Sequence, residues 1–378
     1  MTIHADSDRP LVSAVIPAFN AAAVIERTVR SVITQTYPEM EILVVDDGST
    51  DETASIVKGL SADDGRVKLL QQENKGVSAA RNLGIKCARG EYIAPLDADD
   101  TWLPEKIEKQ VEVFRTSSAT VGLVYTQSVR IFEDGRPSVY SASTEEGSVF
   151  FPLLLGNFLQ NASTPLIRRQ CLDKVGLYSL DYRNSNAQGC EDWDIYLRLA
   201  EHYEYRVVGE FLTGYWQSTD SMSADWKLMD RSYQLLMEGV RKRHPEIPEY
   251  IFRWSRSNYF LYLANRAAQA SEAASSMRLL VRAVSSDPFM LSNRRLQRLV
   301  AKNLLGPGRG NKSTAPVTAR HKPVTNEGGR GVRSTAAGTV WGGRLKQRKK
   351  RLDKLQKELG LDRMSGIVGK GSGRIGET

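Results

Sequence analysis

The stretch EILVVDDGSTD, residues 41–51, decides the fold class of this chain. It opens with an apolar run and ends in two aspartates and a glycine, which is typical of a buried strand followed by a turn. Upstream, residues 11–16 form a second apolar run that Pro17 closes, and apolar residues at helical spacing lie between the two runs. Strand, helix and strand within about 35 residues form one βαβ unit.

The same alternation continues to residue 95. We expect four further elements: a helix over 51–58 with Ser49 or Thr50 as its N-cap, a strand over 67–70, a helix over 76–87 and a strand over 92–95. This alternation predicts an α/β fold with a mostly parallel central sheet and helices on both faces. In such sheets ligands bind beyond the carboxyl ends of the strands.

Long helical patterns follow after residue 223. We expect helices over 231–243, 249–268 and 271–284, each with an apolar stripe that must pack against another surface. Residues 306–343 are rich in glycine, small polar and basic residues, and are too polar to bury a core. A basic amphipathic helix is expected over 344–361.

The composition is that of a packed protein, since 41% of the 378 residues are hydrophobic and 25% are charged. The three cysteines are widely spaced and form no Cys-x-x-Cys pair, so we expect reduced thiols and a cytoplasmic protein. The first ten residues are polar and no apolar run approaches about 18 residues, which predicts neither a secretory signal nor a transmembrane span.

The net charge of +8 is unevenly distributed. From Lys302 onward there are 18 Lys and Arg against 5 Asp and Glu, so this part carries +13 and the rest of the chain −5. We expect the basic tail to dock at an anionic membrane surface, at the inner face of the cell membrane, with a merely solvated tail as the alternative. Nucleic acid is not favoured, because Trp341 is the only aromatic residue of the tail.

Acidic residues follow two of the predicted strands. Asp97, Asp99 and Asp100 come directly after the strand over 92–95, and three carboxylates so close together repel one another unless a cation lies among them. Mn²⁺ or Mg²⁺ fits such oxygen ligands, whereas a solvated acidic turn is the alternative for this motif alone. Asp46 and Asp47 face the same crevice, where a carboxylate accepts hydrogen bonds from a uracil or a ribose or, alternatively, caps a turn.

Four motifs in order resemble those of family 2 glycosyltransferases of the GT-A fold. They are VIPAFN at 15–20, VVDDGSTD at 44–51, NKGVSAARN at 74–82 and LDADD at 96–100. The resemblance extends over residues 11–223. It implies a GT-A glycosyltransferase domain over 1–225, whereas the helical patterns predict a C-terminal extension over 226–305 and the composition predicts a basic, largely disordered tail over 306–378.

The resemblance also implies a nucleotide-sugar site. The residues expected to bind the donor are Pro17, Ala18, Asn20, Asp46, Asp47, Asn74, Arg81 and Asp97. Asp99, together with Asp97, would ligate Mn²⁺ or Mg²⁺. Asn82 and Gly84 are instead expected to serve close packing of the fold, and the loops over 157–165 and 182–189 are expected to shape the donor-sugar pocket.

The stretch GCEDWDIYL at 189–197 resembles the family's Glu-Asp motif at the start of a helix. The resemblance implies that Asp192 is the general base for an acceptor hydroxyl, that Glu191 orients this base or the acceptor, and that Trp193 offers a flat face to an acceptor sugar. The alternative is that acidic residues only favour the positive end of the helix dipole. One base and one displacement predict inversion at the anomeric carbon.

The chain departs from the family where a Tyr-Arg-x-His stretch is usual. Trp216 stands in place of the Arg and Ser218 in place of the His. Either another group completes the diphosphate site, such as Asp220 or a basic residue from the helices, or the site is weakened.

The sequence therefore predicts an inverting metal-dependent glycosyltransferase that moves a sugar from a nucleotide-diphosphate donor, with a UDP-sugar favoured, to a hydroxyl of a glycan or lipid-linked glycan, as in cell-surface polysaccharide synthesis. The alternative is a catalytically silent nucleotide-sugar-binding or scaffold protein. Nucleotidyl transfer is a weaker rival, because no basic glycine-rich phosphate loop follows the first strand.

Overall fold

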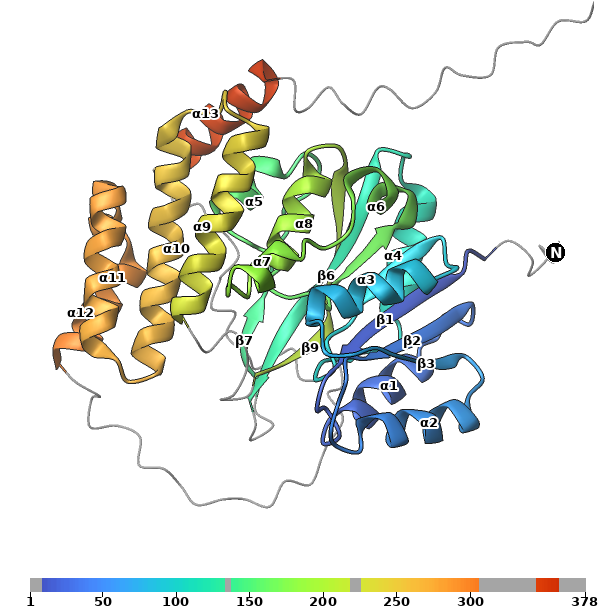
Figure 1. The fold of residues 1–378 in the computed structure, drawn as a ribbon. Helices are drawn as coiled ribbons and strands as arrows, with labels where there is room; N and C mark the ends of the chain where they lie inside the picture. Colours follow the sequence, from blue (N-terminus) through green and yellow to red (C-terminus); the bar gives the residue numbers. More distant parts are fainter. Residues whose placement is uncertain (1–8, 133–136, 218–225, 306–344, 360–378) are drawn as a thin grey trace, which may run out of the picture.

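The computed structural model describes residues 9–132, 137–217, 226–305 and 345–359 (Figure 1). Its N-terminal part contains β1 (Val12–Ala18), α1 (Ile25–Ile33), β2 (Met40–Asp46), α2 (Thr53–Asp63), β3 (Val67–Gln71), α3 (Val77–Cys87) and β4 (Tyr92–Pro95). Every element expected up to residue 95 is thus confirmed. The expected N-cap of α2 is wrong: neither Ser49 nor Thr50 caps it, and the Asp51 carboxylate instead accepts a hydrogen bond from the Thr53 amide at 3.0 Å.

The next part of the chain alternates less regularly. Its elements are β5 (Thr101–Trp102), α4 (Lys106–Thr116), β6 (Val121–Phe132), β7 (Pro137–Ser141), α5 (Phe150–Leu155), β8 (Pro165–Arg168), α6 (Arg169–Val175), α7 (Asp181–Asn184), α8 (Glu191–Ala200) and β9 (Glu204–Gln217). The two long strands β6 and β9 pair along most of their length.

The strands join one mixed sheet in the order β3-β2-β1-β4-β8-β6-β9-β5, with β7 paired to β6. Parallel pairing links β1 to β2 and β4, β2 to β3, and β6 to β9, whereas β8, β5 and β7 pair antiparallel. The predicted α/β class is confirmed, and the predicted parallel arrangement applies to β1–β4. Because β1 lies between β2 and β4, their carboxyl ends open into one crevice.

Two hydrophobic clusters explain why the first strands are apolar throughout. Side chains of β1 alternate between the clusters: Val15 belongs to the cluster that contains Ile85 of α3, and Ile16 to the cluster that contains Val29 of α1. Helices α1, α2 and α4 contribute to one cluster, and α3, α5, α6 and α8 to the other. The sheet is therefore covered by helices on both faces.

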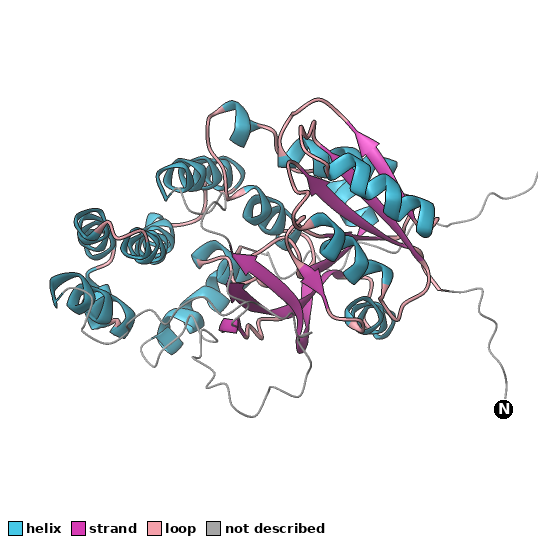
Figure 2. Ribbon diagram, turned by 90° about the horizontal axis from the view of Figure 1, so that it is seen from below, coloured by secondary structure: helices cyan, strands magenta, loops and turns pink. Residues whose placement is uncertain are grey.

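The C-terminal helices are α9 (Trp226–Arg243), α10 (Glu249–Gln269), α11 (Ala273–Ser286) and α12 (Arg294–Leu305), with a 3-10 turn η2 (Pro288–Ser292) before α12. The first three helices are as predicted, and α12 is an addition. Figure 2 shows these helices gathered to one side of the strands. Their apolar stripes share a cluster with α5 and α8, which is the surface that the sequence required. The division into domains at 225 stays a prediction.

The predicted basic helix forms α13 (Leu345–Glu358), next to α9 and α10 in Figure 1. Leu352 is buried in the same hydrophobic cluster, with Leu355 and Leu359 packed against it, and Gln356 donates to the Ser148 carbonyl at 3.1 Å. The apolar face of α13 is therefore taken up by the protein itself. The predicted disordered stretch over 306–343 lies outside the described residues.

Two smaller expectations concern the thiols and the membrane. Cys87, Cys171 and Cys190 are all unpaired, as expected for reduced thiols. Among the helices that the structure describes, none combines the length and apolarity needed to cross a bilayer.

Asn82 and Gly84 serve the packing of α3, as expected. The Asn82 amide group donates to the Tyr178 carbonyl at 2.8 Å and accepts from the Tyr178 amide at 2.9 Å. Gly84 faces β1 and β2 so closely that an added methyl group would collide with Val15 and come within 3.2 Å of Val45. These contacts hold α3, and the residues that it carries, against the sheet.

We predict that Gly84→Ala lowers the free energy of unfolding by about 1–3 kcal/mol, because β1 and β2 must shift to admit the methyl group. Gly59→Ala is the matched control: it lies inside α2 with no heavy atom within 4 Å of the added methyl, so it should be neutral or stabilising. Urea denaturation followed by circular dichroism measures both. Equal stability of Gly84→Ala and the unaltered protein would contradict the packing argument.

Candidate active site

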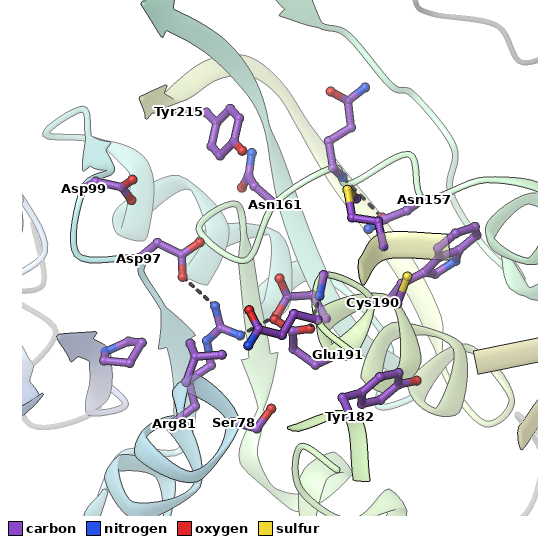
Figure 3. A pocket seen from close by; sticks show the side chains of 18 of the residues that line it. Ser78, Arg81, Asp97, Asp99, Asn157, Asn161, Tyr182, Cys190, Glu191 and Tyr215 are labelled. Carbon is purple, nitrogen blue, oxygen red and sulfur yellow. Dashed lines mark hydrogen bonds and ion pairs between the residues drawn. The ribbon is translucent and has the colours of Figure 1, made fainter. Parts of the chain in front are cut away.

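A cavity of about 1380 Å³ opens at the carboxyl ends of β1, β2 and β4 and extends to α10. Ligand pockets commonly measure about 300–1,000 Å³, so this one has room for more than one small molecule. The predicted site residues in its wall are Pro17, Ala18, Asn20, Asp47, Asn74, Arg81, Asp97, Asp99, Glu191, Asp192 and Trp193. Figure 3 shows part of this wall. Asp46 is the predicted residue that does not line it.

Arg81 of α3 connects two sides of the cavity. Its side chain is 2% exposed, and its guanidinium donates to Asp97 at 2.5 Å and to Asp192 at 2.7 Å. Figure 3 shows it reaching toward Asp97 at the end of β4. The Tyr178 ring lies 5.1 Å from the guanidinium. Three separate elements, β4, α3 and α8, therefore meet at one positive charge.

The carboxyl group of Asp192 is tuned by its surroundings. Burial raises its pKa to about 7, with nearby Glu191 and Asp97 adding to the rise and Arg81 opposing it. A carboxylate with a pKa near 7 is a far stronger base than an exposed one and is still largely ionised at slightly alkaline pH. The group is thus suited to accept a proton near neutral pH.

The three aspartates after β4 have different environments. Asp100 is fully buried and accepts hydrogen bonds from the Ser163 hydroxyl and, at 3.0 Å, from the Trp216 amide. It therefore ties β9 to the end of β4. Asp99 lines the cavity, and burial together with the charge of Asp97 raises its pKa to about 6. The expected acidic triple is in effect a cavity pair, Asp97 and Asp99, plus one structural carboxylate.

The pair Asp97 and Asp99 fits a hard divalent cation. The negative charges of Asp97 and Asp99 repel each other, and this repulsion contributes to the raised pKa of Asp99. A cation between the two carboxylates would relieve it. Within the described residues no group of three or more acidic, His or Cys side chains is arranged as a metal site. Mg²⁺ and Mn²⁺ accept such an incomplete protein shell when a diphosphate and water supply the other ligands.

Asp46 and Asp47 are engaged by neighbouring protein groups. Asp46 is buried and accepts from the Ser49 amide at 3.0 Å and from Gln71 at 3.1 Å. Asp47 accepts from the backbone amides of Lys75 and Gly76 at 2.8 and 2.7 Å. Both therefore brace the loops at the cavity rim, and Asp47 keeps a position in the wall itself.

Asn20 and Asn74 also brace the rim. Asn20 adopts a left-handed backbone (φ 48°), and its side-chain oxygen accepts from the Thr50 amide at 2.9 Å. The Asn74 side-chain oxygen accepts from Arg183 at 2.8 Å. These contacts link the β1, β2 and β3 loops to α7, so the rim is a connected structure rather than a set of separate loops.

Trp193 and Glu191 lie at the start of α8. The Trp193 indole is 4% exposed, donates to the Leu153 carbonyl at 2.8 Å, and packs near the Tyr233 and Tyr259 rings at 5.8 and 5.9 Å. Little of its ring is open to an acceptor sugar. The Glu191 carboxylate accepts from the Gly189 amide at 2.8 Å, which fixes the loop before the helix.

Arg27 of α1 is a site residue that the sequence did not reveal. Its guanidinium stacks 3.8 Å from the centroid of the Trp216 ring and donates to the Asp99 carbonyl at 2.8 Å. Both Arg27 and Trp216 line the cavity. A basic group from α1 thus lies beside the position where the family pattern has Arg. Ser218 and Asp220 lie outside the described residues.

Other walls of the cavity come from later in the chain. The two expected loops do line it, through residues such as Asn157, Asn161 and Tyr182. Helix α10 adds Tyr262, Asn265 and Arg266, and α12 adds Arg295, none of which the sequence marked. No local pattern could have found them, because a helical stripe does not tell which cavity its polar edge faces.

Residues 13–176 match the family described as Glycosyl transferase family 2. A protein of Bacillus subtilis, TuaG, whose name assigns it provisionally as a teichuronic acid biosynthesis glycosyltransferase, is 39% identical over 130 residues, which cover 34% of this chain and 51% of that protein. Chondroitin synthase of Escherichia coli is 39% identical over 126 residues, 33% of this chain and 18% of that protein.

The chain thus spans about half the length of TuaG and less of the synthase. Among solved structures, that of S. aureus TarS 1-349 in complex with UDP-GlcNAc has a TM-score of 0.48 and 15% sequence identity, covering 73% of this chain and 91% of that chain. The family match contains the ends of β1, β2 and β4 and the Asp97–Arg81 pair. Residues 13–176 of this chain therefore belong to glycosyl transferase family 2.

Proposed function

We propose that this protein is an inverting, metal-dependent glycosyltransferase that moves a sugar from a nucleotide-diphosphate donor, with a UDP-sugar favoured, to a hydroxyl of a glycan or lipid-linked glycan. The observation that carries the proposal is that Arg81 binds Asp97 and Asp192 together in one cavity of a family 2 domain. One carboxylate belongs to the strand end where a donor diphosphate would lie, and the other has the pKa of a base.

The donor would lie across the ends of β1, β2 and β4, with its base and ribose against Pro17, Ala18 and Asp47. Asp97 and Asp99 would hold a Mn²⁺ or Mg²⁺ ion, which when bound supplies positive charge to the leaving diphosphate. Arg81 holds the Asp97 carboxylate in place for that task through its ion pair.

Asp192 would act as the general base. It would take the proton of the acceptor hydroxyl as the hydroxyl oxygen attacks the anomeric carbon and the bond to the diphosphate oxygen breaks. Attack from the face opposite the leaving group, in a single displacement, inverts the configuration at that carbon. Arg81 holds Asp192 at a fixed distance from the donor side, so the base needs no large movement to reach the acceptor.

Arg27 would take over the diphosphate contact that the family's Arg supplies elsewhere. Its guanidinium is held by the Trp216 ring and the Asp99 carbonyl. Burial lowers the pKa of Arg27, and the negative charges of Asp99 and Asp100 oppose this effect. A guanidinium held in this way can bind phosphate oxygens with two donors at once. The missing Arg is then no sign of a silent protein.

The acceptor is proposed to be a growing glycan or a lipid-linked glycan. TuaG and chondroitin synthase carry names of polysaccharide synthesis, and the cavity has space beyond a donor on the side of α10. A cytoplasmic enzyme working at the inner face of the cell membrane fits such an acceptor.

We predict that Asp192→Asn reduces the transfer rate on the order of 10²–10⁴-fold, because the acceptor proton loses its base. With the unaltered protein kcat/KM should rise with pH through about 7, since Asp192 is inactive while protonated and active once ionised. Release of nucleoside diphosphate from a panel of nucleotide-sugars measures both. Asp194→Asn is the control, because that carboxylate pairs with Arg198 at 2.9 Å instead. Donor binding with unchanged turnover in Asp192→Asn would rule out the assigned base.

We predict that Mn²⁺ strengthens UDP binding by about tenfold or more and that Asp99→Asn removes most of this gain. The reason is that this substitution removes one of the two carboxylates in the cavity wall that are available to the ion, Asp97 and Asp99. Calorimetric titration with UDP, in Mn²⁺ or in chelator, gives the difference. Asp63→Asn, on the exposed face of α2, should behave like the unaltered protein. UDP binding that ignores Mn²⁺ would contradict the metal role.

We predict that Arg27→Met weakens donor binding by roughly tenfold to a hundredfold, because a charge-assisted hydrogen bond to a phosphate oxygen is lost. Arg30→Met is the matched control on the same helix, since Arg30 is exposed and pairs with Glu26 at 2.8 Å. The KM for the donor and the thermal midpoint separate binding from folding. Identical KM values for the two variants would exclude Arg27 from the diphosphate site.

A further inference from the structure

The corner formed by η2 and α12 presents apolar and basic side chains to solvent. Phe289 is 68% exposed and Leu291 61% exposed, two positions apart in η2. Arg294, Arg298 and Lys302 follow on α12 and are all exposed. We call these five residues the η2–α12 surface. Exposed apolar side chains of this size, next to polar or charged residues, mark surfaces that contact another protein or a membrane.

This surface is rigidly built. Met290, between the two exposed residues, is buried, and the Asp287 side chain accepts from the Phe289 amide at 3.3 Å. Leu296 and Leu299 of α12 are buried in the main hydrophobic cluster. The anchors thus hold Phe289 and Leu291 outward rather than leaving them on a loose segment.

The charge of the surface is of one sign. Arg294, Arg298 and Lys302 are spaced by four residues, so they lie along one face of α12. Residues 288–305 contain four Lys and Arg and no Asp or Glu. The chain that continues from Leu305 is basic as well. A stripe of positive charge therefore begins three residues after Leu291 in the chain.

We propose that the η2–α12 surface docks on an anionic phospholipid bilayer, with Phe289 and Leu291 in the headgroup boundary and the α12 stripe on the lipid phosphates. A membrane surface uses both halves of this pattern, apolar insertion and positive charge. An acidic glycan would leave Phe289 and Leu291 in water, and the apolar face of α13 is already packed on the protein. The contact thus lies in the folded body and not in the tail helix.

The docking surface adjoins the cavity. Arg295, between Arg294 and Arg298 on the first turn of α12, lines the cavity wall. A docked molecule would therefore hold the α10–α12 side of the cavity near the bilayer, where a lipid-linked acceptor would enter. This orientation rests on the proposed transferase function, whereas the docking itself does not.

The test is co-sedimentation of the full chain with vesicles of phosphatidylcholine alone or mixed with phosphatidylglycerol. We expect binding to the anionic vesicles only, weakened by about tenfold in Phe289→Ser/Leu291→Ser, which loses apolar insertion. Arg294→Gln/Arg298→Gln should weaken it by a similar factor. The control Arg30→Gln/Arg115→Gln makes the same change of net charge on exposed helix faces of α1 and α4 and should bind like the unaltered protein.

Three results would overturn the proposal. The first is equal sedimentation of the unaltered protein and both η2–α12 variants, which would leave the tail as the binding segment. The second is no preference for anionic over neutral vesicles. The third is a change of oligomeric state in Phe289→Ser/Leu291→Ser on gel filtration, which would make the surface a contact between copies of the chain. None of these measurements uses a sugar donor, so failure of the transferase assignment leaves them interpretable.

Discussion

A single buried ion-pair system, Asp97–Arg81–Asp192, is the constraint on which the site depends. A guanidinium with 2% exposure is tolerable only while its charge is compensated, and loss of Arg81 would leave both carboxylates without their counter-charge. The two carboxylates stand at the end of β4 and the start of α8. Their separation is consequently set by one rigid side chain, and α3 must stay packed on the sheet for that side chain to reach both. Gly84 and Asn82 secure this packing.

The same residue type serves opposite purposes at and beside one cavity in this fold. Asp100 is sealed between strands by a hydroxyl and an amide, and its pKa is raised well above the usual range by burial first and by the charges of Asp99 and Asp97. Asp99 keeps a face to the cavity, and Asp192 holds a pKa near 7 despite its arginine. Desolvation, more than any single partner, sorts these carboxyl groups into structural and chemical roles.

Much of the first hundred residues could be predicted, because buried parallel strands and amphipathic helices have distinct local periods. The motifs also led to Arg81, Asp97, Asp99 and Asp192, which meet in one cavity. The second half of the sheet resisted prediction, since its antiparallel pairing depends on partners far apart in sequence. Arg27 on Trp216 is a contact across almost two hundred positions, and neither residue carries a local signal for the other. Asp46 is buried and braces a loop because of its tertiary surroundings, and these are not encoded in the local motif.

The cavity wall is continuous, yet its sides come from separate parts of the sequence. The family match ends at residue 176, while Tyr262, Arg266 and Arg295 complete the same wall from α10 and α12. The side of the wall at the strand ends therefore lies within the family match, and the opposite side comes from helices outside it. Substitutions in those helices reshape the room offered to an incoming partner while the strand ends stay intact. Selection thus has a way to retarget the protein by remodelling one wall at a time.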